Sequence, residues 1–185
     1  MKLTFLAPLA MATGVLGACS DGADDATNDE ARVEARITSV LANGDDLGIL
    51  NKAFETTGLA TLFDSPGASY TILAPQDAAF SAVQTDEDLP TPVLAAMLRE
   101  HILPGHLDRA SIVDAIEANG GPVTMNTVGT GMIEFSLDGE TLTATHSNGG
   151  QPAKLSDSAG EAQNGVVLKV DSMLVTPPAQ SGSES

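Results

Sequence analysis

The sequence predicts one domain of the α+β class, with helices in its first half and a meandering β-sheet in its second half. Between residues 33 and 118, apolar residues recur mainly three or four positions apart, which is the spacing of an amphipathic helix. From residue 132 onward, apolar and polar residues alternate on both sides of Asp138-Gly139, one of the strongest short-range hairpin signals. The folded part, about 140 residues, suits one hydrophobic core, and no internal repeat divides it.

The first elements are predicted from helical spacing. Residues 33–41 and 47–54 are expected to form helices, and residues 59–63 a further turn. Ser65-Pro66-Gly67 interrupts this pattern before a short apolar strand at residues 70–73.

A corner follows this strand. Pro75 cannot donate to a sheet ladder, so the strand is expected to stop there. Asp77 then stands at the N-cap position of a helix that starts with Ala78, Ala79 and Phe80. Asp77 is interpreted as a structural residue that caps this helix and fixes the corner. The alternative is an exposed carboxylate that contacts a partner.

Two more helices are expected before the sheet. One begins at Thr91-Pro92 and ends at Pro104-Gly105, and the other runs from residue 111 to residue 118. The first of them places four residues on one face: Leu94, Met97, Leu98 and His101. Because His101 shares this apolar face, we interpret it as a buried, hydrogen-bonded core histidine, with direct recognition as the alternative. Glu100 lies off the apolar stripe and is expected at the surface.

Strands fill the remaining sequence. Residues 132–137 and 141–146 form the predicted hairpin, and residues 154–156 a short strand. The buried face of the hairpin is expected to hold Ile133, Phe135, Leu142 and Ala144. The last strand covers residues 166–175 and starts from the turn Asn164-Gly165, whose turn chemistry is enough to explain both residues.

Three segments of the chain resemble the fasciclin domain family. Residues 71–80 (TILAPQDAAF) and 164–171 (NGVVLKVD) are similar to its two signature segments, in the same order. Residues 100–105 (EHILPG) resemble its central Tyr-His segment, with Glu100 in place of the tyrosine. The resemblance covers residues 34–177 and implies a compact β-sandwich wedge flanked by several helices.

The same resemblance implies a function in binding or adhesion. By analogy with the family, the candidate binding surface consists of Glu100, His101, Ile102 and Leu103, while Asp77, Asn164 and Gly165 belong to the structural motifs. The expected partner is a protein or polysaccharide of the cell envelope or matrix, contacted by a monomeric domain. The alternative function is that of a carrier for an apolar small molecule such as a carotenoid.

The N-terminus reads as a bacterial lipoprotein signal. Residues 1–18 hold Lys2 and then an apolar run that is too short to span a bilayer, which takes roughly 20 apolar residues. Leu16-Gly17-Ala18-Cys19 resembles a lipobox, in which the cysteine is acylated. Since Cys19 is the only cysteine of the chain, it cannot form an internal disulfide. The alternative is an ordinary cleavage site beside an unrelated cysteine.

Two further segments are expected outside the fold. Residues 19–33 are acidic and contain no large apolar side chain before Val33, so they read as a flexible tether. Residues 178–185 read as a disordered tail.

Ser20, directly after the cysteine, resembles the sorting signal that favours the outer over the inner membrane of a bacterial envelope.

Composition and motifs exclude several classes of function. Eight Lys and Arg stand against 25 Asp and Glu, a formal net charge of −17 that repels nucleic acid. The histidines have no Cys, Asp or Glu at a recognisable metal-ligand spacing, and neither a nucleophile motif nor a phosphate loop is present. We therefore expect no enzyme, no metal and no cofactor.

Overall fold

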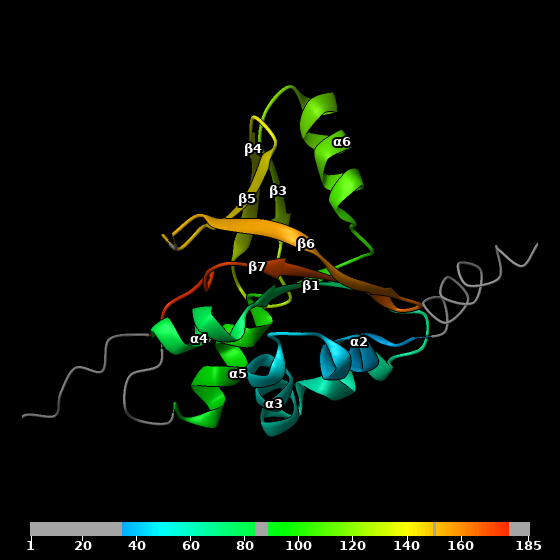
Figure 1. The fold of residues 1–185 in the computed structure, drawn as a ribbon, viewed down its shortest axis with the longest axis vertical. Coiled ribbons are helices and arrows are strands. Elements are labelled where there is room, and N and C mark those ends of the chain that lie inside the picture. The colour runs from blue at the N-terminus through cyan, green and yellow to red at the C-terminus, as the bar shows by residue number, and fades with distance from the viewer. Residues whose placement is uncertain (1–34, 84–88, 150, 178–185) are drawn as a thin grey trace, which may run out of the picture.

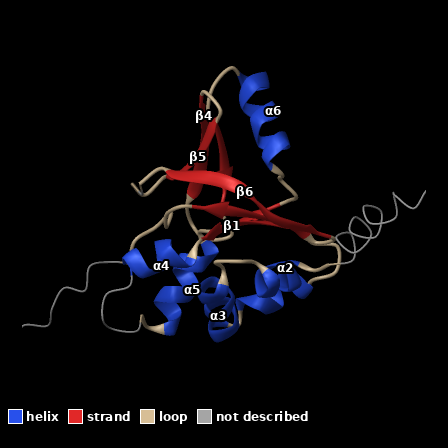
Figure 2. Cartoon of the chain, viewed as in Figure 1, coloured by secondary structure: helices blue, strands red, loops and turns tan. Residues whose placement is uncertain are grey.

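The structure is a computed structural model and describes residues 35–83, 89–149 and 151–177. These residues form seven strands, five α-helices and one 3₁₀ helix (Figures 1 and 2). In chain order they are α2 (Ile37–Asn43), α3 (Gly48–Thr57), the 3₁₀ helix η1 (Leu59–Asp64), β1 (Tyr70–Pro75), α4 (Asp77–Val83), α5 (Thr91–Arg99), β2 (Ile102–Pro104), α6 (Arg109–Asn119), β3 (Val123–Asn126), β4 (Met132–Asp138), β5 (Thr141–His146), β6 (Ala153–Ala162) and β7 (Gly165–Val170). The predicted α+β class is confirmed.

The strands form one sheet in the order β2-β1-β7-β6-β5-β4-β3. Only β1 and β7 run parallel, and every other neighbouring pair is antiparallel. The sheet bends at β6, because Ala153 and Lys154 pair with β5 whereas Leu155 and the residues after it pair with β7. Figure 1 shows β3, β4 and β5 standing across the strands β6, β7 and β1. The bent sheet forms the predicted wedge.

The parallel pair β1 and β7 brings the two signature-like segments of the sequence side by side. Ile72 lies opposite Val167, and Leu73 lies opposite Leu168. Ile72 and Val167 face the helices, while Leu73 and Leu168 face the other half of the sheet. Both faces of these strands are buried at their centres, and residues 72–74 and 166–168 are accordingly continuous apolar runs rather than alternating ones.

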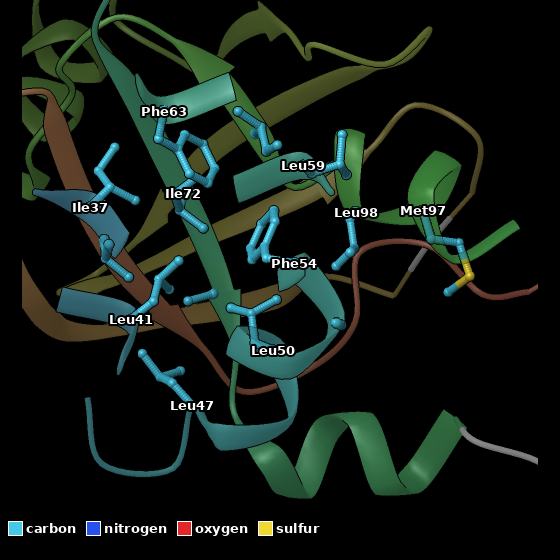
Figure 3. Close-up of a cluster of buried hydrophobic side chains, with 14 of the residues drawn as sticks. Ile37, Leu41, Leu47, Leu50, Phe54, Leu59, Phe63, Ile72, Met97 and Leu98 are labelled. Carbon is cyan, nitrogen blue, oxygen red and sulfur yellow. The ribbon is translucent and has the colours of Figure 1, made fainter. Parts of the chain in front are cut away.

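The first hydrophobic core lies between this half of the sheet and α2, α3, η1 and α5 (Figure 3). Phe54 of α3 and Phe63 of η1 meet edge to face at its centre, with ring centroids 5.4 Å apart. Tyr70 continues the contact, with its ring centroid 5.8 Å from that of Phe63. Edge-to-face packing of this kind adds about 0.5–1.5 kcal/mol per pair to the gain from burial. Leu50 and Leu98 close the core from α3 and α5.

The second core fills the inside of the wedge. Phe135 of β4 and Leu142 of β5 pack in one cluster with Val166 of β7, so the two halves of the bent sheet face each other. Ile112 and Ile116 bring α6 against the same cluster. The predicted hairpin is confirmed, with the register Asp138 to Thr141 at its turn, and its four predicted inward residues are all buried.

Other strand predictions were wrong. β2 and β3, of three and four residues, were missed because so short a run carries almost no alternation. β6 covers ten residues instead of three, because register shifts near Ser158 break its two-residue period. β7 ends at Val170 and not at residue 175, although Met173 and Leu174 remain buried.

Candidate functional site

Glu100 is the centre of the most concentrated polar arrangement inside the described residues. It caps the C-terminus of α5, where the chain turns into β2, and only 9% of it is exposed. Its carboxylate enters the segment between β3 and β4, residues 127–131 (TVGTG), here called the 127–131 loop. The prediction that Glu100 lies at the surface is therefore wrong. A position off the apolar stripe of a helix need not be exposed when it is the last residue before a turn.

Five hydrogen bonds hold the carboxylate. Oε1 accepts from the backbone N–H of Thr130 at 2.7 Å and from its hydroxyl at 3.2 Å. Oε2 accepts from the Thr127 hydroxyl at 2.6 Å, the Gly131 N–H at 3.0 Å and His146 Nε2 at 3.0 Å. A carboxylate offers about four lone-pair sites, so this one is saturated with donors.

A hydrogen bond to Nδ1 of His146 fixes the tautomer of the ring. It ends β5 and is 1% exposed. Its Nδ1 accepts from the N–H of Asn148 at 3.2 Å, so the ring proton belongs on Nε2 and is donated to Glu100. The arrangement is a carboxylate surrounded by neutral donors.

Two glycines let the backbone approach the carboxylate. A Cβ at Gly129 would overlap the Glu100 carboxylate, and a Cβ at Gly131 would overlap the His146 ring. Any side chain at either position would therefore push the loop away from its acceptor.

The electrostatics of the site keep Glu100 ionised. Burial alone would raise the pKa of Glu100, but the hydrogen bonds from Thr127, Thr130, His146 and Gly131 together lower it to about 2. The site thus stabilises a buried negative charge through hydrogen bonds.

His101 is a core histidine, as its position on the apolar face of the helix predicted. It is fully buried; its Nδ1 donates to Met97 O at 2.9 Å and its Nε2 accepts from Leu174 N at 3.1 Å. Burial lowers the pKa of His101 to about 4, so the ring is neutral at neutral pH. The ring joins α5 to the segment after β7.

The other two residues of the candidate binding surface are also buried. Ile102 packs in the first core and Leu103 in the second. All four side chains, from Glu100 to Leu103, thus point into the fold and not toward a partner at the surface. A binding role of residues 100–103 stays a prediction, and the buried positions of these four side chains do not support it.

Asp77 fixes the corner after β1, but it caps a different helix from the one predicted. Its Oδ1 accepts from Ile49 N of α3 at 2.8 Å, and its own N–H donates to Asp46 O at 2.8 Å. At the start of α4 itself, the N–H groups of Ala79 and Phe80 donate to Gln76 O. The sequence pattern showed a cap but could not show that the nearest free amide belongs to another helix.

Asn164 does more than form a turn. Its Oδ1 accepts from Ile37 N at 2.9 Å, and its Nδ2 donates to Phe63 O at 2.7 Å. It thereby joins α2 and η1 to the turn between β6 and β7. Gly165 has a φ of +147°, and a Cβ there would collide with the carbonyl oxygen of Tyr70. Turn chemistry alone does not explain these two residues.

The predicted lipid attachment residue, Cys19, lies outside the described residues, as do the signal segment, the whole tether and the tail. Within residues 35–83, 89–149 and 151–177, no helix has the length and apolarity needed to cross a bilayer. The same ranges contain no group of three or more His, Cys, Asp or Glu arranged to hold a metal ion.

Comparisons with known proteins identify the family. Residues 45–177 match the Fasciclin domain family, whose members are non-catalytic modules associated with adhesion and binding. No curated protein sequence matches the chain.

The fold is similar to that of a FAS1 domain pair from the insect cell adhesion molecule fasciclin I, with a TM-score of 0.63 and 12% identity. The similarity covers 77% of this chain and 51% of the fasciclin I chain, so this chain spans about half the length of that structure. Since the family match extends over more than half of its residues, the chain belongs to the fasciclin domain family.

Proposed function

We propose that the chain is a membrane-anchored, extracytoplasmic binding or adhesion module that contacts a protein or polysaccharide of the envelope or matrix. The observation that carries this proposal is the family match over residues 45–177, because fasciclin domains are associated with adhesion and binding. The sequence before the match supports the anchor: residues 1–18 resemble a lipoprotein signal, and the acidic residues 19–33 suit a tether.

The anchor proposal assigns lipid attachment to Cys19 and favours the outer membrane because Ser20 follows the cysteine. Each buried CH₂ of an acyl chain adds about 0.8 kcal/mol, so several chains hold a protein stably in a bilayer. Cys19→Ser should release the protein from the membrane fraction or leave its signal uncleaved, whereas Ser20→Ala should fractionate as the wild type does. A Cys19→Ser variant that stays with the membrane after signal removal contradicts the anchor.

The partner can be sought directly. A head of residues 34–177, immobilised without its tether, should enrich a specific component of native envelope or culture matrix over beads that carry residues 19–33 alone. Protease treatment of the extract removes a protein partner, and periodate oxidation removes a polysaccharide partner, so the two classes separate. If the head enriches no component of either the envelope or the culture matrix, the binding proposal fails.

The carrier function is the second candidate, and the packing favours it less. The large apolar side chains of both described cores already pack against one another, with Phe54, Phe63 and Phe135 fully buried. Absorbance of protein purified from its native membrane distinguishes the two functions, because a bound carotenoid is visible at once.

A further inference from the structure

We propose that the 127–131 loop and His146 form a binding site for a carboxylate group, and that Glu100 occupies this site as an intramolecular ligand. Two segments that are separate in the sequence converge on the two oxygens: the 127–131 loop, through Thr127, Thr130 and Gly131, and the end of β5, through His146. The donors to Oε2 are buried, with Thr127 8% exposed and His146 1% exposed, whereas Thr130, which donates to Oε1, lies at the exposed rim of the site.

The loop is held in place by bonds that do not involve the Glu100 side chain. Thr127 N donates to Gly131 O at 3.0 Å and closes the loop on itself. Val128 N donates to Ile102 O at 2.8 Å, and Gly129 N donates to Arg99 O at 3.1 Å, which fixes the loop to the backbone on either side of Glu100. Because these anchors are backbone groups, the donors should keep their positions when the carboxylate is removed. A site preorganised in this way binds its ligand at a lower entropic cost.

The donor geometry selects a carboxylate over other anions. One set of donors serves Oε1 and a separate set serves Oε2, which matches a flat anion with two oxygens. A Cβ at Gly129 would overlap the carboxylate, and a Cβ at Gly131 would overlap the His146 ring, so the backbone fits closely around the bound group. A tetrahedral phosphate would bring two further oxygens for which no donor is present among these groups, and a halide would leave one set of donors without a partner.

The Glu100→Ala change removes four heavy atoms from the site: Cγ, the carboxyl carbon and its two oxygens. Together these atoms have the size and shape of one acetate ion. Acetate and formate are therefore the expected ligands of the vacated site. In the native chain the site is filled, and an added carboxylate has no vacancy to bind.

The test compares thermal unfolding of the full chain by circular dichroism in sodium acetate, sodium chloride and sodium phosphate, at pH 7 and equal ionic strength. Acetate at ten times its Kd should raise the Tm of Glu100→Ala by about 5 °C over chloride. The wild type and Glu134→Ala, which changes an exposed glutamate of β4, should show no such difference. In the double variant Glu100→Ala/His146→Ala, acetate should bind at least about tenfold more weakly, because the Nε2 donor is lost.

Equal Tm values of Glu100→Ala in acetate and chloride overturn the proposal, as does a larger rise in phosphate. Should Glu100→Ala fail to fold in chloride, recovery of its circular dichroism on refolding from urea replaces the Tm. Acetate-dependent recovery then supports the site, and no recovery in acetate overturns it. Glu100→Gln provides the second variant: its side chain still fills the space, so its Tm should not respond to acetate.

Discussion

His146 Nε2 lies 3.0 Å from Glu100 Oε2, although the two residues are 46 positions apart in the sequence. The contact joins the end of α5 to the end of β5, and so it links the helical layer with the hairpin half of the sheet. Among the described residues, the one ion pair between a basic and an acidic side chain is Arg36 with Asp64, and both of these side chains are largely exposed. Exposed pairs contribute about 0–1 kcal/mol, so the buried contact matters more to stability.

Glu100→Ala should lower the free energy of unfolding by roughly 3–5 kcal/mol, because each buried donor left without an acceptor costs about 1–3 kcal/mol. Glu134→Ala, on the exposed face of β4, should change it by less than about 0.5 kcal/mol. Urea denaturation at pH 7 measures both variants. Equal stabilities of the two would show that the Glu100 hydrogen bonds contribute nothing net.

The buried histidine could be predicted from the sequence, whereas the partners of Glu100 could not. His101 follows Leu94, Met97 and Leu98 at helical spacing, so local periodicity placed it in the core. The donors to Glu100 come from positions 27 to 46 residues away, and no local period reports such contacts.

Two signals near those donors were nevertheless present in the sequence. His146 continues the inward alternation of Leu142 and Ala144 along β5, which predicts a buried polar ring that needs a partner. Gly129-Thr130-Gly131 breaks a β-rich region with two glycines, a pattern typical of a close backbone approach. The pairing of the two signals with Glu100 depends on how the sheet bends at β6, which is a property of the whole fold.

His101 should make stability depend on pH between about 6.5 and 4. Its pKa is about 4 in the folded protein and 6.5 in the reference state, so the unfolded chain binds the proton first as pH falls. Acidification across this range therefore removes stability, by up to roughly 3 kcal/mol. His101→Ala should be less stable at pH 7 by about 2–4 kcal/mol, from the cavity and the unpaired Leu174 N–H.

The pH dependence separates this role from a pure packing effect. The free energies of unfolding of the wild type and His101→Ala are measured by urea denaturation at pH 7, 5.5 and 4.5. Plotted against pH, the two curves should converge on acidification, because only the wild type loses the contribution of His101. All other ionisable side chains are present in both proteins, so the comparison isolates His101. Parallel curves would mean that the imidazole of His101 is not buried neutral.

Gly165→Ala should destabilise the fold by more than about 3 kcal/mol or prevent folding, since the added Cβ would collide with Tyr70 O in the parallel pair β1 and β7. Gly120→Ala is the matched control, because Gly120 also has a positive φ, +69°, but open space around it. That change should cost only about 1–2 kcal/mol, the strain of a left-handed alanine. Thermal unfolding followed by circular dichroism compares the two, and equal costs would contradict the steric argument.

A fragment of residues 34–177 should fold by itself as a monomer, whereas residues 45–177, the range of the family match, should not suffice. The shorter fragment lacks α2, whose Ile37 and Leu41 are 0% and 2% exposed in the first core. Burial of two such side chains contributes about 1.5–3 kcal/mol each, and Asn164 Oδ1 also loses its donor, Ile37 N.

The longer fragment should show one cooperative thermal transition and a monomeric elution volume. The shorter should melt at least about 10 °C lower or aggregate. A shorter fragment of equal stability would mean that α2 is dispensable, and a molten longer fragment would show that the domain boundaries are wrong.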